Sequence, residues 1–185
     1  ESAQLAVAGR KKESVQVLND LRSRHLGIAA DLIPAGKEFA AVTKTIDDIT
    51  AKLANLVEGV SLIGELTSRS MDMFAAQGEF LSSSIIAPAL READVRAVYF
   101  DVRQVMITNQ QYSNAVPDTA LLKKNCGRVL RPLVEEQQIP VTQGFIGSTS
   151  DGITTTLGRG GSDYSAALLG AATDAEDIEI WTDVD

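Results

Sequence analysis

The sequence predicts an α/β protein: a three-layer αβα sandwich with a mainly parallel sheet, preceded by an N-terminal helical hairpin. Two long segments near the N-terminus repeat apolar residues at helical spacing. The second half alternates strand-like and helix-like segments, which is typical of parallel βαβ units. The chain has 185 residues, which is enough for one domain. Because 44% of the residues are hydrophobic and 23% are charged, the chain can form a buried core, and intrinsic disorder is excluded.

The hairpin is predicted over residues 14–32 and 37–60. Its first helix carries an apolar stripe with steps of three and four residues, made of Leu18, Leu21, His25, Ile28 and Leu32. Its second helix repeats the spacing at Phe39, Val42, Ile46, Ile49, Leu53, Leu56 and Val60. Because only the breaker at 34–36 separates the helices, they should run antiparallel. We expect both stripes to pack in the core, and His25 to be a packed or partly exposed side chain rather than a ligand.

The α/β part follows in alternating elements. Two helices, over residues 68–77 and 79–92, are predicted to join at Gly78, and Pro88 should kink the second. The remaining elements are a strand over 95–100, a helix over 118–137, a strand over 139–146, a helix over 162–172 and a final strand over 178–185. Pro117 suits the start of its helix, and Pro140 suits the beginning of its strand.

Charge and composition exclude several classes of function. The net charge is −8 and no long stretch is dominated by Lys or Arg, so we expect no nucleic-acid partner. No stretch approaches the roughly 18 apolar residues of a membrane span. Cys126 is the only cysteine and His25 the only histidine, which excludes a disulfide framework, a cysteine-based zinc site and a Ser-His-Asp triad without His25. We therefore predict a reduced, cytoplasmic protein without a metal site of its own.

The two ends of the sequence look cut. The chain opens on Glu1 without a Met or a signal segment, and it closes on a strand-like segment at 178–185. Ligands of open α/β sheets bind just outside such strand tips. We therefore expect an internal fragment of a longer protein.

A segment rich in Gly, Ser and Thr at residues 147–163 carries the candidate chemistry. Its glycines at 158, 160 and 161 match neither the dinucleotide fingerprint nor a Walker A loop, and they lead into a helix near Ser162. A helix start with free N–H groups attracts anions, and the guanidinium of Arg159 suits a carboxylate or phosphate. Asp163 would repel a phosphate unless it orients a lysine or holds Mg²⁺, which favours phosphoryl transfer. The residues alone equally allow a plain turn, with Ser162 or Asp163 as an N-cap.

Residues 154–167 resemble the signature of the aspartokinases, members of the amino-acid kinase superfamily. The matching string is Thr-Thr-Thr-Leu-Gly-Arg-Gly-Gly-Ser-Asp-Tyr-Ser-Ala-Ala. Four further blocks resemble the family in the same order, at 77–82 (its "GE-x-x-S" helix start), 100–103, 141–147 and 181–184. The resemblance covers residues 78–185 strongly and the helical first part only by position. It implies one partial catalytic domain, with a helical part at 1–66 and an α/β part at 67–185.

The resemblance implies a function and a site. Aspartokinases phosphorylate the side-chain carboxylate of L-aspartate with ATP and Mg²⁺, giving 4-phospho-L-aspartate, the first step of lysine, threonine and methionine biosynthesis. By resemblance, the substrate residues are Glu79 at the α-amino group, Arg159 at the carboxylate and Ser162 as a donor. Asp163 is expected to orient a catalytic lysine. The remaining expected residues are Gly158, Gly160 and Gly161 in the phosphate loop, and Thr182 and Asp183 at the nucleotide.

Other features limit or compete with this interpretation. The family's Lys-Phe-Gly-Gly-Thr-Ser strand, whose lysine stabilises the transferring phosphoryl group, has no counterpart here, so we expect this chain alone to be inactive. The resemblance also implies a homo-oligomeric parent protein. Asp101 and Arg103 are interpreted as a local ion pair outside the site. Two alternatives stay open: another amino-acid kinase, acting on glutamate, acetylglutamate or a nucleotide, and a non-catalytic α/β module that assembles through its helical hairpin.

Overall fold

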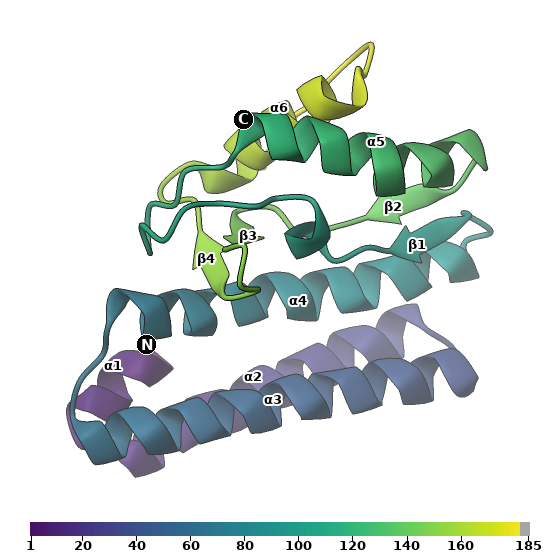
Figure 1. The fold of residues 1–185 in the computed structure, drawn as a ribbon. Helices are drawn as coiled ribbons and strands as arrows, with labels where there is room; N and C mark the ends of the chain where they lie inside the picture. Colours follow the sequence, from purple (N-terminus) through teal and green to yellow (C-terminus); the bar gives the residue numbers. More distant parts are fainter. Residues whose placement is uncertain (182–185) are drawn as a thin grey trace.

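The computed structural model describes residues 1–181 and confirms the α/β class (Figure 1). Helices lie on both sides of a small layer of strands, and the hairpin packs beyond one of them. The helices are α1 (Ser2–Val7), α2 (Lys11–Leu32), α3 (Lys37–Ile63), α4 (Ser68–Glu92), the 3-10 helix η1 (Val102–Gln104), α5 (Thr119–Glu135) and α6 (Gly161–Thr173). The strands are β1 (Ala97–Tyr99), β2 (Ile139–Val141), β3 (Ile146–Ser148) and β4 (Thr154–Thr156).

The hairpin of α2 and α3 forms as predicted, with a partly different apolar face. On α3 the stripe is confirmed at Val42, Ile46, Ile49, Leu53 and Val60, which are buried. Phe39 and Leu56 are half-buried against the core, and Val57 is buried although it was not predicted. On α2 the prediction is wrong at its C-terminal end: Ile28 and Leu32 are exposed, and Ala29 is buried. A small alanine lets α2 approach its neighbours closely, so the buried stripe shifts by one residue. The half-buried His25 bonds through Nδ1 to the Leu21 carbonyl oxygen, at 2.7 Å.

One helix, α4, replaces the two predicted around Gly78. The Thr67 hydroxyl caps its start by accepting from the Ser70 N–H at 3.1 Å. Gly78 lies mid-helix at an exposed position, and a Cβ there would meet no other atom within 4 Å. The helix continues because α4 packs against α3 on one side and against β1 and β4 on the other. Such tertiary contacts outweigh the roughly 1 kcal/mol helix penalty of one glycine.

A parallel βαβ unit forms the centre of the α/β part. β1 pairs with β2 in parallel, with Ala97 opposite Ile139 and Tyr99 opposite Val141. Helix α5 connects the two strands on the face opposite α4, as Figure 1 shows. Its N-cap is Asp118, whose carboxylate accepts from the Leu121 N–H at 2.9 Å, so Pro117 lies just outside the helix.

The segment after β2 departs from the prediction. The strand predicted over 139–146 ends at Val141, and β3 begins a second sheet at Ile146. Within the predicted loop, β4 pairs antiparallel with β3, with Ile146 opposite Thr156. The prediction of a loop rich in Gly, Ser and Thr is therefore wrong at residues 154–156. They form a strand because β-branched side chains suit a pleated surface once a partner strand is present.

The final strand is absent over the part that the structure describes. Helix α6 covers the predicted residues 162–172, but residues 178–181 form no strand, and Trp181 is 87% exposed. Among residues 1–181, no strand pairs with this segment, and a lone extended segment leaves its backbone hydrogen bonds unmade. The rest of the predicted strand, 182–185, lies outside the described residues. Within residues 1–181, no helix is long and apolar enough to cross a membrane.

Candidate functional site

A tight glycine turn, residues 158–161, connects β4 to α6. Gly158 and Gly160 have φ of +80° and +71°, a backbone region that costs other residues about 1 kcal/mol or more. A Cβ on Gly158 would lie 2.7 Å from Asn114 Oδ1, and one on Gly161 would lie 2.9 Å from the Phe145 ring. The turn therefore requires glycine for conformation at two positions and for close packing at two.

The turn leads directly into the N-terminus of α6, and no side chain caps that helix. The N-cap residue is Gly160, so the alternative in which Ser162 or Asp163 serves as the N-cap is wrong. Instead Ser162 and Asp163 lie inside the first turn of the helix, where both are exposed. Backbone N–H groups of a first turn have no partner within the helix and form the positive end of its dipole.

Arg159 adds a cation beside these N–H groups. It is exposed, and within residues 1–181 neither Arg159 nor Asp163 forms an ion pair. The turn thus brings together a guanidinium, a hydroxyl at Ser162 and a helix N-terminus. This set of donors can bind a carboxylate or a phosphate.

Phe145 forms the other wall of the turn and was not identified from the sequence. Its φ is +66°, which is a strained conformation for a bulky residue. The Phe145 N–H donates to Ser165 Oγ at 2.9 Å, and its carbonyl accepts from the Leu157 N–H at 2.8 Å. Gly144 allows α6 to approach, since a Cβ there would lie 3.2 Å from Ser162 Cα. No sequence signal marks a positive φ at phenylalanine, so only the structure reveals this wall.

The floor of the turn is a buried carboxylate, which was also missed. Asp72 of α4 is 1% exposed and accepts from the backbone and hydroxyl of both Ser113 and Thr156. Thr156 is the last residue of β4, two positions before Gly158. Acidic residues of a helix are mostly exposed, so the sequence gives no signal that Asp72 is buried.

Glu79 lies on the same face of α4 as Asp72, two helical turns further on. It is half-buried, and burial raises the pKa of its carboxyl above the ordinary value. Its backbone carbonyl accepts from Ser83 Oγ at 2.6 Å, and Ser83 in turn accepts from the buried Gln143 at 2.8 Å. Among residues 1–181, no cation pairs with Glu79. A partly desolvated carboxylate without a partner is suited to a cationic ligand group.

Asp101 and Arg103 form the ion pair that the sequence suggested, at 2.6 Å. Arg103 also donates to Thr154 Oγ1 at 2.9 Å and lies 4.6 Å from the centroid of the Phe80 ring. Because Thr154 begins β4, this pair anchors the strand to α4. These contacts with Asp101, Thr154 and the Phe80 ring support a structural role for Arg103.

The described residues include only part of the predicted nucleotide site. Thr182 and Asp183, the predicted nucleotide residues, lie outside the described residues. Within residues 1–181, no group of three or more His, Cys, Asp or Glu could hold a metal ion. The donors at the turn fit phosphate oxygens. Mg²⁺ is commonly held by one or two carboxylates together with substrate phosphates, and Asp163 is the carboxylate at hand.

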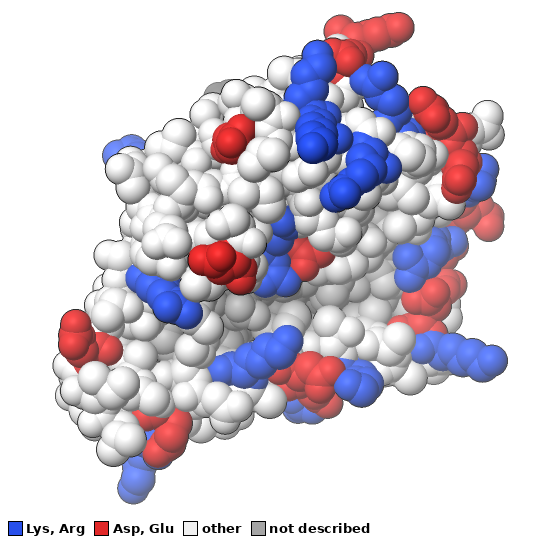
Figure 2. Space-filling model, viewed as in Figure 1, with Lys and Arg blue, Asp and Glu red and all other residues white. Residues whose placement is uncertain are grey.

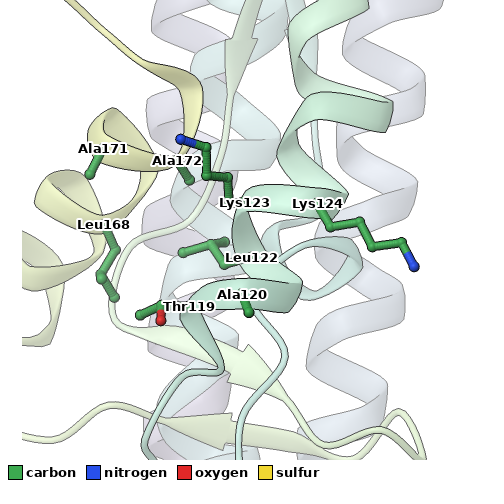
Figure 3. A pocket seen from close by; sticks show the side chains of 8 residues that line it. All are labelled: Thr119, Ala120, Leu122, Lys123, Lys124, Leu168, Ala171 and Ala172. Carbon is green, nitrogen blue, oxygen red and sulfur yellow. The ribbon is translucent and has the colours of Figure 1, made fainter.

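A hollow between α5 and α6 is separate from this turn (Figure 3). Its volume is about 590 Å³. Its lining is mostly apolar and consists of Thr119, Ala120, Leu122, Lys123, Lys124, Leu168, Ala171 and Ala172. None of the predicted site residues that the structure describes lines this hollow. The volume of a hollow therefore does not by itself identify the functional site.

Charged side chains of both signs are interspersed over the face seen in Figure 2. Ion pairs connect separate elements of the fold, such as Arg91 with Glu38 at 2.8 Å and Arg131 with Asp174 at 2.6 Å. Basic side chains gather over the upper part of this face, where α5 lies, and charges of both signs alternate elsewhere.

Comparisons with known proteins agree on one family. Residues 12–185 match the amino acid kinase family. Among curated proteins, the lysine-sensitive aspartokinase 3 of Escherichia coli K12 is 44% identical over 141 residues, which are 74% of this chain and 31% of that protein. The chain thus spans about a third of the length of this relative.

Solved structures give the same result. The chain superposes on the crystal structure of E. coli aspartokinase III with lysine and aspartate (T-state), with a TM-score of 0.87 and 36% identity. The TM-score is 0.82, at 37% identity, for the same protein with aspartate and ADP (R-state). The match covers 100% of this chain, and 41% and 40% of those two chains.

Proposed function

This chain belongs to the amino acid kinase family, and from that premise we propose that it is the central part of the catalytic domain of an aspartokinase. The protein would transfer the γ-phosphoryl group of ATP to the side-chain carboxylate of L-aspartate. The related E. coli structures carry aspartate in both states, and ADP in one of them, which supports these two substrates.

One observation carries the proposal: the uncapped N-terminus of α6 lies directly beside Arg159. The helix N–H groups and the guanidinium offer several charge-assisted donors to a carboxylate. We assign Arg159 to the carboxylate of aspartate, with Ser162 as an additional donor. Glu79, partly desolvated on α4, takes the α-ammonium group, which needs an anionic acceptor.

The remaining groups serve phosphoryl transfer. ATP with Mg²⁺ supplies the phosphoryl group, and we assign its phosphates to the turn of Gly158, Gly160 and Gly161. A Cβ at Gly160 would meet no atom within 4 Å, so the turn is open to a ligand at that residue. Asp163, exposed in the first turn of α6, orients the catalytic lysine of the family, which has no counterpart among these 185 residues, toward the transferring phosphoryl group. Such catalysis depends on positioning and charge stabilisation rather than on covalent chemistry.

A second candidate is an amino-acid kinase that acts on another carboxylate substrate. The turn with Arg159 supports this second candidate as strongly as an aspartokinase, since any carboxylate fits a guanidinium. Glutamate would need more space between Glu79 and Arg159, and N-acetylglutamate lacks the cationic amine that Glu79 is suited to bind.

A substrate panel tests the proposal. The complete open reading frame that contains this chain is assayed for ADP release with ATP and Mg²⁺ against aspartate, glutamate, N-acetylglutamate and no acceptor. We expect aspartate to raise turnover into the range of roughly 1–100 s⁻¹ that is typical of kinases. Preferred use of glutamate or N-acetylglutamate would transfer the assignment to the second candidate.

A further inference from the structure

We propose that Asp72 is a positioning residue, which fixes the glycine turn relative to the helix that carries Glu79. The kinetic part of this inference rests on the proposed function, and the structural part does not. Asp72 lies on α4, outside the turn itself, and the described residues give its carboxylate no cation.

The contacts of Asp72 converge from two segments. Its Oδ1 accepts from Thr156 Oγ1 at 2.8 Å and from Ser113 Oγ at 3.2 Å. Its Oδ2 accepts from the backbone N–H of Thr156 at 2.9 Å and of Ser113 at 2.9 Å. The side chain is 1% exposed, so water cannot replace these bonds. One carboxylate therefore satisfies four donors, two from buried Thr156 and two from exposed Ser113. Without Asp72, the two donors of Thr156 would be buried without partners.

Both segments touch the glycine turn directly. Thr156 ends β4 and leads through Leu157 into Gly158. Ser113 has a φ of +67°, and its carbonyl oxygen lies 3.1 Å from the place a Cβ of Gly158 would take. The Ala115 N–H also donates to the Thr156 carbonyl at 2.8 Å. Asp72 thus holds both the strand that enters the turn and the surface against which the turn packs.

The same carboxylate sets the relation between two proposed substrate groups. Glu79 follows Asp72 by seven residues, about 10 Å along the axis of α4. Arg159 follows Thr156 by three residues. Because α4 is rigid between Asp72 and Glu79, the bonds from Asp72 to Thr156 fix the distance between the ammonium site and the carboxylate site. Positioning of this kind governs the affinity for a substrate held at both ends.

The test is Asp72→Asn in the complete open reading frame. The side-chain amide of Asn presents N–H groups to N–H donors, so part of the network is lost at unchanged volume. We expect the KM for aspartate to rise about tenfold, as for loss of one charge-assisted bond, and the KM for ATP to change by less than about twofold. The stability control is Leu53→Ala in the hairpin core, which should lower the melting temperature without changing the KM for aspartate.

A second pair of variants keeps the inference testable if Asp72→Asn does not fold. Thr156→Val removes the hydroxyl donor at nearly constant volume, and Thr156→Ser retains it. We expect Thr156→Val to show part of the increase in the KM for aspartate that Asp72→Asn shows. The KM of Thr156→Ser should resemble that of the wild type. Equal values of this KM for Val and Ser would contradict the inference.

Amide hydrogen exchange separates this inference from the proposed function. Exchange of residues 157–162 should become at least about tenfold faster in Asp72→Asn, and should stay at the wild-type rate in Leu53→Ala. This readout is valid even if the wild type phosphorylates no aspartate. Unchanged exchange in this segment, together with a lower melting temperature, would show that Asp72 only stabilises the fold and would overturn the inference.

Discussion

The hairpin and the α/β part are built on different interactions. Among the described residues, the buried polar side chains lie between residues 72 and 165, with the single exception of Ser14. The hairpin is held by an apolar stripe on α3 and by exposed ion pairs, such as Arg22 with Asp47 at 2.7 Å. The α/β part is held by apolar contacts as well, but Asp72, Gln143 and Ser165 add buried, directional hydrogen bonds.

This difference indicates where precise geometry is needed. Apolar contacts tolerate small shifts, whereas a buried hydrogen-bond network loses much of its stability when one partner moves. The directional bonds surround the glycine turn, with Asp72 beneath it and Ser165 holding Phe145 beside it. We infer that the hairpin supplies stability and that the polar network supplies the geometry of the site.

The largest expected effect on stability lies in the hairpin. Leu53 is 3% exposed in the core, and Leu53→Ala should lower the free energy of unfolding by about 2–5 kcal/mol through lost burial and a cavity. Thermal and urea melts measure this loss. The KM values should stay at those of the wild type, and a changed KM for aspartate would break the proposed division between the two regions.

The largest effect on catalysis should come from Asp163. In the complete open reading frame, Asp163→Asn should lower kcat by about 100-fold or more, close to 3 kcal/mol of barrier, with both KM values nearly unchanged. Asp163 is exposed and does not cap α6, so the melting temperature should stay close to that of the wild type. Steady-state kinetics beside a melt check both points, and a kcat within about threefold of wild type would remove Asp163 from the catalytic groups.

A smaller effect, confined to substrate affinity, is expected from Arg159→Ala. Loss of a guanidinium–carboxylate pair should raise the KM for aspartate about tenfold, or roughly 1.5 kcal/mol, with little effect on the KM for ATP. Because Arg159 is exposed, its removal should leave the melting temperature unchanged. Lys124→Ala, at an exposed position of α5, serves as the charge-matched control. An increase in the KM for ATP alone would place Arg159 at the nucleotide.

The smallest effect is a pH dependence from Glu79. Burial raises the pKa of its carboxyl, so protonation begins at a higher pH than for an exposed glutamate. Only the ionised form attracts an ammonium group, and therefore the KM for aspartate should increase severalfold as the pH falls through this raised pKa. Glu79→Gln should have a high KM that no longer varies over this range. A pH profile of wild type that matches that of Glu79→Gln would contradict the role.

The sequence predicted the elements that depend on local periodicity and missed those that depend on distant partners. The stripe on α3 emerged because its spacing is regular and its residues are large. On α2, Ala29 was overlooked because a small residue gives a weak apolar signal. Gly78 was interpreted as a break because the packing of α4 against the strands cannot be deduced from the helix alone.

The candidate site shows the same limit. Residues 158–163 could be proposed as a site because the string around them resembles the aspartokinase signature, whereas the residue types alone equally allow a plain turn. Phe145 and Asp72 could not be predicted, since a positive φ and a buried carboxylate are properties of the folded neighbourhood. Both lie far from the turn in sequence, at 13 or more residues before Gly158, and only the folded chain brings them together.

The most direct test of the central claim is the chemical identity of the product. The complete open reading frame is incubated with ATP, Mg²⁺ and an equal mixture of aspartate and glutamate, and acyl phosphates are trapped with hydroxylamine. Our account predicts the β-hydroxamate of aspartate, with its yield sharply reduced in Asp163→Asn and retained in Leu53→Ala below its melting temperature. A γ-glutamyl hydroxamate as the main product, or equal yields from the wild type and Asp163→Asn, would contradict it.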